Sequence, residues 1–253
     1  MQKQGKKGAK VIALCGKGGV GKTSISAMII KILIEDPGKK VLAIDADPAI
    51  GLAIALGMEV SKTVDDIRNE LIKRVETGNG EDRTSTVTRL DYEMVSALVE
   101  KENLAFLAIG RPEKEGCYCQ VNHILKDIIA SMADHFDYVV IDGEAGVEQV
   151  NRRVMEKVSH LILVSDASVK GLNVARTIQE VSRTAIQFEK SGLIINRIQD
   201  GMPSLPQEMQ LLGTIPEDNP IRICDMQGRS ILQLPESNAV KEVRNCIARM
   251  GIT

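Results

Sequence analysis

The sequence predicts an α/β fold with a doubly wound, mostly parallel sheet and helices on both faces. Short apolar runs typical of buried strands alternate along the chain with longer amphipathic stretches typical of helices. A glycine-rich octet separates the first apolar run from the first amphipathic stretch, as in folds that bind phosphate between a strand and a helix. With 253 residues and 43% hydrophobic content, the chain can bury a sizeable core. We expect a flexible basic tail at 1–9 and a single domain over 10–253.

Short apolar runs bounded by polar or glycine residues predict the strands. They lie near 10–15, 40–45, 104–109, 137–142, 159–164, 191–196 and 212–215. Stretches with apolar residues at helical spacing predict the helices. They lie near 22–35, 64–75, 91–101, 120–135, 147–156, 171–187, 204–210 and 236–250. The polar stretch 76–89 shows no periodicity and contains Gly78-Asn79-Gly80, so we expect a mobile insertion there.

Bulk composition favours a cytoplasmic protein. The formal net charge of −2 creates no field that would attract nucleic acid or a membrane surface, so neither is expected as a partner. No apolar run approaches the length of a membrane-spanning helix, and the lysine-rich N-terminus lacks the apolar core of a signal peptide. Five cysteines, an odd number at uneven spacing, argue for a reducing compartment and against a disulfide framework.

The octet from Gly16 to Thr23 has the complete phosphate-loop pattern G-x-x-x-x-G-K-[ST]. Its glycines let the backbone curl around an anion with the N–H groups pointing inward, and the following helix adds positive potential. Lys22 is expected to reach the β- and γ-phosphates and to act in catalysis, while the Thr23 hydroxyl ligates Mg²⁺. The chain is therefore predicted to bind a nucleoside triphosphate. The expected contacts are Gly16, Gly18, Gly19, Val20, Gly21, Lys22, Thr23 and Ser24.

Carboxylates follow two of the predicted strands, at the edge where parallel sheets bind ligands. One strand continues as Asp45-Ala46-Asp47-Pro48 and another as Asp142-Gly143-Glu144. Asp47 is the catalytic candidate for orienting the attacking water. Asp45 would act in the outer sphere of Mg²⁺ or pair with Lys22, and Asp142 would hold Mg²⁺ through water. The alternative for Asp45 and Asp47 is an ordinary acidic turn after a strand.

Lys17 adds a second lysine at the start of the loop, which the general pattern does not require. At the outer edge of the loop it is poorly placed for its own phosphates and well placed to reach the nucleotide of a second copy, as an arginine finger does. The alternative is a solvated lysine. The run K-G-G-V-G-K-T that starts at Lys17 resembles the deviant phosphate loop of the MinD/ParA/nitrogenase-iron-protein class of dimerising ATPases. This resemblance implies ATP, a homodimer and a catalytic role for Lys17 in trans.

Two later segments fit recognition of the nucleotide base. An amide such as Asn196 at the end of a strand can donate to and accept from an adenine edge, although a helix cap or turn is an equal alternative. Pro216 and Asp218 follow the last predicted strand, where their backbone would wrap the base. In the MinD-like class the corresponding asparagine and post-proline residues contact adenine, and the resemblance implies this role for Asn196, Pro216 and Asp218.

A Cys117-Tyr118-Cys119 pair stands just before the helix predicted at 120–135. Thiols at a helix N-terminus have lowered pKa values and bind metals as thiolates. Two cysteines cannot complete a four-coordinate site, and Cys15, Cys224 and Cys246 stand singly, so two pairs across a homodimer would supply the four sulfurs. Such a site suits Zn²⁺, and also Ni²⁺ or Cu⁺. The alternatives are a redox-active pair or two unrelated buried cysteines.

The motifs together resemble the CooC-type nickel-insertion ATPases, which mature carbon monoxide dehydrogenase and acetyl-CoA synthase. The resemblance covers most of the chain and rests on Gly110-Arg111-Pro112, Gly116 to Cys119, Asn122, Asp45 to Pro48, and Asp142 to Gly146. It implies an ATP-dependent homodimer that holds nickel or zinc at Cys117 and Cys119 and hydrolyses ATP slowly without its client enzyme. The alternatives are a spatial-positioning ATPase of the MinD/ParA type and an iron–sulfur scaffold like the nitrogenase iron protein.

Overall fold

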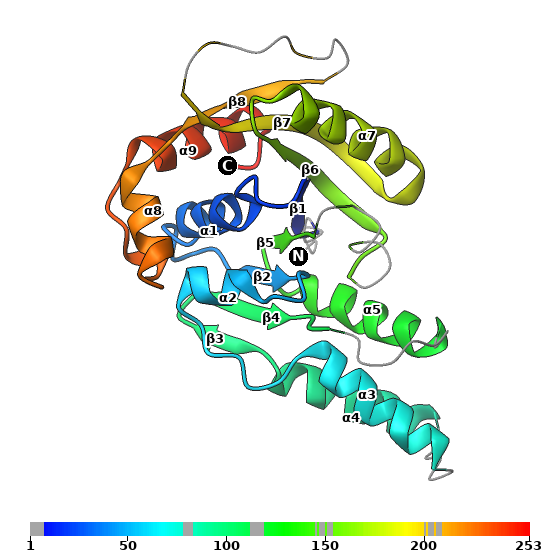
Figure 1. Ribbon diagram of the computed structural model, residues 1–253. Helices are drawn as coiled ribbons and strands as arrows, with labels where there is room; N and C mark the ends of the chain where they lie inside the picture. Colours follow the sequence, from blue (N-terminus) through cyan, green and yellow to red (C-terminus); the bar gives the residue numbers. More distant parts are fainter. Residues whose placement is uncertain are drawn as a thin grey trace, which may run out of the picture.

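One sheet carries the fold and brings the ends of its central strands to a common edge (Figure 1). The computed structural model describes residues 8–77, 83–111, 119–144, 146, 150, 154–199, 201, 205 and 209–253. Within them, the sheet has eight strands in the order β3-β4-β2-β5-β1-β6-β7-β8. Neighbouring strands are parallel, except that the edge strand β3 is antiparallel to β4. The doubly wound, mostly parallel sheet expected from the sequence is confirmed.

The strand bounds follow the apolar runs of the sequence. They are β1 (Lys10–Gly16), β2 (Val41–Asp45), β3 (Val99–Lys101), β4 (Leu104–Ala108), β5 (Tyr138–Asp142), β6 (Lys157–Ser165), β7 (Gln187–Ile198) and β8 (Leu211–Pro216). Side chains of successive residues point to opposite faces of a sheet. Ile12 and Leu14 of β1 accordingly enter one core cluster, and Ala13 and Cys15 enter the other. Both faces are buried, which is why these strands are apolar throughout.

Helices cover both faces of the sheet. Their bounds are α1 (Lys22–Leu33), α2 (Gly51–Leu56), α3 (Val64–Glu76), α4 (Arg83–Ser96), α5 (Cys119–Ala133), α7 (Val169–Ala185), α8 (Asn219–Met226) and α9 (Asn238–Arg249), with a short 3₁₀ helix η1 (Ile231–Gln233). Helices α1, α2, α8 and α9 lie on one face, and α3, α4, α5 and α7 lie on the other (Figure 1). No helix in the described part of the chain is long and apolar enough to cross a membrane.

The structure corrects the prediction for 76–101. Helix α4 begins at Arg83 and ends at Ser96, so much of the expected insertion is helical, and β3 replaces the end of the helix expected at 91–101. Threonine and serine dominate the start of α4, so the spacing of its apolar residues does not show a helical period in the sequence. Leu90 and Met94 lie one turn apart and are almost fully buried in the core shared with α3 and α5. Tertiary packing of this apolar stripe therefore stabilises a helix of poor intrinsic propensity.

Other differences involve short elements. Helices α2 and α8 and the turn η1 have too few residues for a periodic pattern, and the sequence does not predict them. The helix expected at 204–210 is wrong for its described residues 205, 209 and 210, which are not helical. Met209 is only 8% exposed, so its apolar side chain packs on the core without a helix. Most of the helix expected at 147–156 lies outside the described residues.

Candidate active site

The phosphate loop joins the end of β1 to the start of α1, as the sequence predicts. Gly19 and Gly21 have φ angles of 80° and 92°, in the left-handed region that favours glycine. A Cβ atom on Gly16 would overlap the carbonyl oxygen of Val164, and one on Gly21 would overlap the amide of Asn196. Glycine at these positions therefore lets the loop lie against the ends of β6 and β7.

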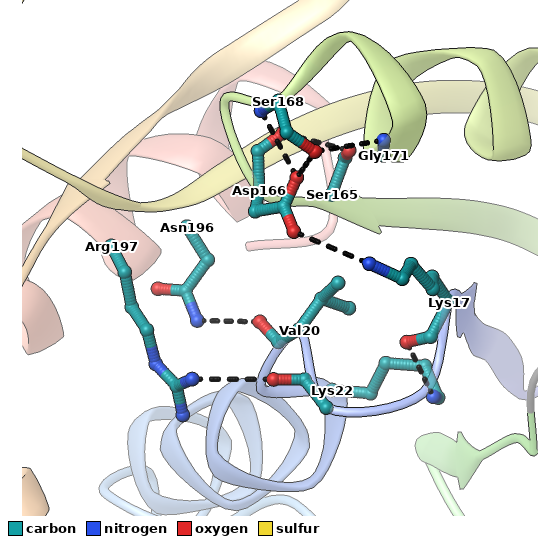
Figure 2. A network of polar contacts seen from close by, with 10 residues as sticks. Lys17, Val20, Lys22, Ser165, Asp166, Ser168, Gly171, Asn196 and Arg197 are labelled. Carbon is teal, nitrogen blue, oxygen red and sulfur yellow. Dashed lines mark hydrogen bonds and ion pairs between the residues drawn. The ribbon is translucent and has the colours of Figure 1, made fainter.

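Lys22 begins α1 and is only 8% exposed. Its ammonium group donates to the carbonyl oxygen of Lys17, on the other side of the loop, at 3.3 Å (Figure 2). The same positive charge acts on Asp142 and opposes the rise of that carboxyl's pKa. The ammonium group of Lys22 is therefore buried beside the loop, which is the position that a phosphate-binding lysine must occupy.

Two buried carboxylates stand on adjacent strands next to the loop. Asp45 of β2 is in register with Asp142 of β5, and the two residues are 0% and 1% exposed. Asp45 accepts hydrogen bonds from the backbone N–H groups of Asp47 at 3.1 Å and Leu52 at 2.8 Å. These bonds hold Asp45 in place and connect the end of β2 to the start of α2.

Hydroxyl groups of α1 tie Asp142 to the loop. Its Oδ1 accepts a hydrogen bond from Ser26 Oγ at 3.0 Å, and the Thr23 hydroxyl also bonds to this carboxylate. Thr23 is the magnesium ligand that the sequence predicts, whereas Ser26 is not part of the motif. Its place one turn after Thr23 in α1 is the only sequence signal that it shares this site. Thr23 and Asp142 are therefore within hydrogen-bonding reach of each other, as a shared cation would require.

Burial raises the pKa of both carboxyls. For Asp45 burial is the main cause and the charge of Asp142 adds to it, so that its pKa rises to about 7. Burial also raises the pKa of Asp142 to about 6, against the lowering effects of Thr23, Ser26 and Lys22. Two carboxylates in one buried site favour a bound cation. The donor set therefore fits Mg²⁺, with Thr23 as ligand, Asp142 acting through water and Asp45 outside it.

The raised pKa values predict an unusual pH dependence of stability. Both carboxyls bind protons more tightly in the folded than in the unfolded state, so the free energy of unfolding should fall as pH rises through the interval between their unfolded and folded pKa values. For the ligand-free protein we expect a loss of about 4 kcal/mol between about pH 5 and pH 8, measured by urea unfolding. Asp142→Asn removes one charge of the pair and should flatten the curve. An unchanged curve in this variant would contradict the repulsion.

Asp47 is half-buried in the turn that follows β2. Its Oδ1 accepts from the backbone N–H of Ala49 at 2.9 Å, and its charge contributes to the raised pKa values of Asp45 and Asp142. Ile50 follows with a φ of 52°, which is uncommon for a β-branched residue. The turn therefore holds Asp47 in a fixed position beside the two buried carboxylates. A residue that orients the water for ATP hydrolysis is expected at this position.

Lys17 extends from the edge of the loop toward the start of α7 (Figure 2). Its Nζ lies 3.8 Å from Oδ2 of Asp166, and both side chains are more than a third exposed. Asp166 Oδ1 also accepts from the backbone N–H of Ser168 at 3.0 Å and from its hydroxyl, and Ser168 caps α7 by accepting from Gly171 at 2.9 Å. The Ser168 bonds, followed by the charge of Lys17, lower the pKa of Asp166. Lys17 is therefore held away from the interior of its own loop.

The residues expected to bind the base meet at one cavity. Asn196, Pro216 and Asp218 line a cavity of about 260 Å³ together with Ser24, the last of the expected loop contacts. Asn196 also bonds to the phosphate loop, so base and phosphate positions are adjacent. The Asp218 carboxylate, however, accepts from the backbone N–H groups of Ile221 at 3.4 Å and Ala239 at 3.2 Å. Asp218 thus caps α8 and binds the start of α9, and only its backbone remains for the base.

The predicted thiolate site falls outside what the structure describes. Cys117 lies outside the described residues, and for Cys119 only its place as the first residue of α5 is described. Among the described residues no group of three histidine, cysteine or acidic side chains could hold a metal ion. Cys15, Cys224 and Cys246 are buried and form no disulfide.

Comparison with known proteins identifies the family. Residues 9–190 match a family described as an AAA domain. The chain belongs to this AAA domain family. An uncharacterized ATP-binding protein of Methanocaldococcus jannaschii is 37% identical, over 91% of this chain and 93% of the relative. The carbon monoxide dehydrogenase accessory protein CooC of Rhodospirillum rubrum is 28% identical, over 88% of this chain and 89% of the relative.

A solved structure places this AAA-domain protein in the same fold as MinD. The septum site-determining protein MinD of Pyrococcus horikoshii, complexed with Mg-ADP, matches over 96% of each chain with a TM-score of 0.67 and 22% identity. The family match and the ATP-binding relative make the protein a P-loop ATPase, and the solved structure shows that its fold is that of MinD. Its phosphate loop, its two buried carboxylates and the cavity lined by Asn196 and Pro216 lie at the carboxyl ends of β1, β2, β5, β7 and β8.

Proposed function

We propose that this AAA-domain ATPase inserts nickel into carbon monoxide dehydrogenase or acetyl-CoA synthase, with ATP hydrolysis controlling a thiolate metal site. The observation that carries the proposal is the Cys117-Tyr118-Cys119 pair in the sequence, whose second cysteine is the first residue of α5, in a chain that is 28% identical to CooC over most of its length. A C-x-C pair at a helix N-terminus is suited to soft metal ions. An ATPase whose task is only positioning has no need of it.

In this proposal each residue of the site has a role in hydrolysis. Loop N–H groups and Lys22 would bind the phosphates, and Thr23 with Asp142 would hold Mg²⁺, which neutralises phosphate charge. Asp47 would orient the attacking water. Asp47 lies in the turn after β2, and Asp142 ends β5. Contact of these two segments with the γ-phosphate would favour one arrangement of them, and loss of the γ-phosphate would favour another.

A homodimer would complete both sites. Lys17 would leave its ion pair with Asp166 of the same chain and contact the nucleotide that is bound to the second copy. Two cysteine pairs would then meet as four thiolates for Ni²⁺ or Zn²⁺. ATP would bring the subunits together and close the metal site, and hydrolysis would loosen the dimer and release the metal ion to the client enzyme. Turnover without the client should be slow because both subunits remain engaged.

The proposal predicts a shared metal ion that depends on the cysteine pair. Anaerobic titration with Ni²⁺ or Zn²⁺, followed by native mass determination, should give one ion per dimer in the wild type. Cys117→Ala/Cys119→Ala should lose it, with affinity falling at least about a thousandfold because a thiolate site loses its ligands. Cys224→Ala is the matched control, since Cys224 is a single buried thiol, and it should bind metal like the wild type. Metal binding that survives in the double variant would refute the site.

The rival function, spatial positioning of the MinD/ParA type, can be tested on the same protein. The helix expected at 236–250 is α9, and its apolar side chains Val240, Val243 and Ile247 are fully buried against the sheet. This face of α9 is not available for a membrane. We expect no ATP-dependent co-sedimentation with anionic lipid vesicles or DNA. Full ATP-driven dimerisation without metal binding, together with such co-sedimentation, would favour the rival.

A further inference from the structure

Two adjacent side chains at the end of β7 hold the phosphate loop from outside (Figure 2). Asn196 Nδ2 donates to the carbonyl oxygen of Val20 at 2.8 Å, and Arg197 Nη1 donates to the carbonyl oxygen of Gly19 at 3.2 Å. The first bond is buried and the second is exposed. The general phosphate-loop motif contains neither residue, so both contacts are additions made by the fold of this chain.

These two bonds fix the direction of backbone donors in the loop. In a trans peptide the carbonyl of one residue and the N–H of the next point in opposite directions. When the carbonyls of Gly19 and Val20 face β7, the N–H groups of Val20 and Gly21 face the other way. The carbonyl of Gly21 accepts a hydrogen bond from the backbone N–H of Ile25 in α1 at 3.1 Å, which also fixes the direction of the Lys22 N–H. The N–H groups of Val20 and Gly21 thus point away from β7, and that of Lys22 points out of the N-terminus of α1, as a phosphate cradle requires.

The backbone of β7 is bent to make this contact possible. Successive side chains of a regular strand point to opposite faces, so Asn196 and Arg197 would not normally reach the same loop. Arg197 has a φ of 55°, uncommon for a residue other than glycine, and the pairing of β7 with β8 shifts register between Asn196 and Ile198. Together, the irregular backbone and the two bonds place consecutive side chains on consecutive loop carbonyls.

We propose that Arg197 is a positioning residue for ATP binding, which acts with Asn196 to preset the N–H groups of Val20 and Gly21 toward the phosphates. Asn196 bonds from a buried position that also lines the base cavity, so it connects base and phosphate recognition. Arg197 supplies the hydrogen bond to the Gly19 carbonyl and takes no direct part in the hydrolysis reaction. A loop already held in its binding conformation loses less entropy when the phosphates bind.

The rival role for Arg197 is a direct contact with the base or ribose, because its side chain lines the same cavity. The two roles differ in which part of the nucleotide loses affinity. If Arg197 orients the loop, Arg197→Met should weaken ATP binding about tenfold, the effect of one charge-assisted hydrogen bond, while adenosine binding stays the same. If Arg197 contacts the nucleoside, adenosine should lose affinity by the same factor.

The measurement is a pair of binding titrations, calorimetry for ATP and competition with a fluorescent nucleotide for adenosine. Arg222→Gln is the matched control: it removes a positive charge from the same cavity, and within the described part of the chain the Arg222 side chain bonds to Asn219 of its own helix, at 3.3 Å. Its effect on ATP measures the loss of a positive charge from this cavity without the loss of a hydrogen bond to the phosphate loop. Arg197→Lys keeps a donor and should recover part of the lost affinity. Equal losses for ATP and adenosine in Arg197→Met, or an ATP loss no larger than that of Arg222→Gln, would overturn the proposal.

Discussion

Replacing Lys17 with glutamine should lower the rate of ATP hydrolysis about a thousandfold, the effect of removing an arginine finger, and abolish ATP-driven dimerisation. ATP affinity of the monomer should change little, because Lys17 is directed at Asp166 and not into its own loop. Steady-state phosphate release measures the first effect, sedimentation or light scattering the second, and calorimetry the third. A variant that dimerises and hydrolyses ATP at the wild-type rate would disprove the role in trans.

Asp166→Asn is the control that separates this role from loss of the ion pair within the chain. The pair is 3.8 Å long and more than a third exposed on both sides, so it contributes at most about 1 kcal/mol. Asparagine keeps the oxygen that accepts from the Ser168 N–H, so α7 should remain capped. If Lys17→Gln acted only by breaking the pair, Asp166→Asn would reproduce its effects. We expect instead that Asp166→Asn hydrolyses ATP and that its dimer forms as readily as that of the wild type or more readily.

The parts of the site that the sequence predicts correctly are those that depend on one strand and its following turn. The loop, Lys22 and Thr23 form a local motif, and the rule that ligands bind at the carboxyl ends of parallel strands located Asp45 and Asp142 without knowledge of strand order. The structure adds that these carboxylates are direct neighbours on β2 and β5. That adjacency, which adds to the rise that burial causes in the pKa of Asp45, depends on strand order, and periodicity does not reveal strand order.

The parts that the sequence does not reveal depend on contacts between distant segments. Arg197 reaches Gly19 from 178 positions away through an irregular strand end, and nothing in the local pattern predicts that irregularity. Asp166 becomes the partner of Lys17 only because β6 lies beside β1. Asp218 illustrates a different limit: it lines the same cavity as Asn196, but its carboxylate caps helices, and its contact with the base stays a prediction. The role of the cysteine pair stays a prediction.

Gly16→Ala should destabilise the ligand-free protein by about 3 kcal/mol, one of the largest effects available outside the core. The added methyl group would overlap the carbonyl oxygen of Val164, and both atoms belong to the backbone of paired strands, so neither can turn aside as a side chain would. The loop cannot relax without breaking the pairing of β1 with β6, which orients the phosphate site. Urea unfolding, with the midpoint and slope compared to the wild type, measures the change.

Gly18→Ala is the matched control two residues further along the same loop. A Cβ atom at Gly18 meets no atom within 4 Å, and its φ is not positive, so this variant should unfold with the midpoint of the wild type. The pair separates two reasons for glycine in a phosphate loop: Gly16 is required by the fold, whereas any loss of hydrolysis in Gly18→Ala must come from the nucleotide or a second subunit. Equal midpoints for both variants would show that β1 and β6 can separate at Gly16 without loss of stability. In that case the close packing of the loop on β6 would not be what fixes the shape of the loop.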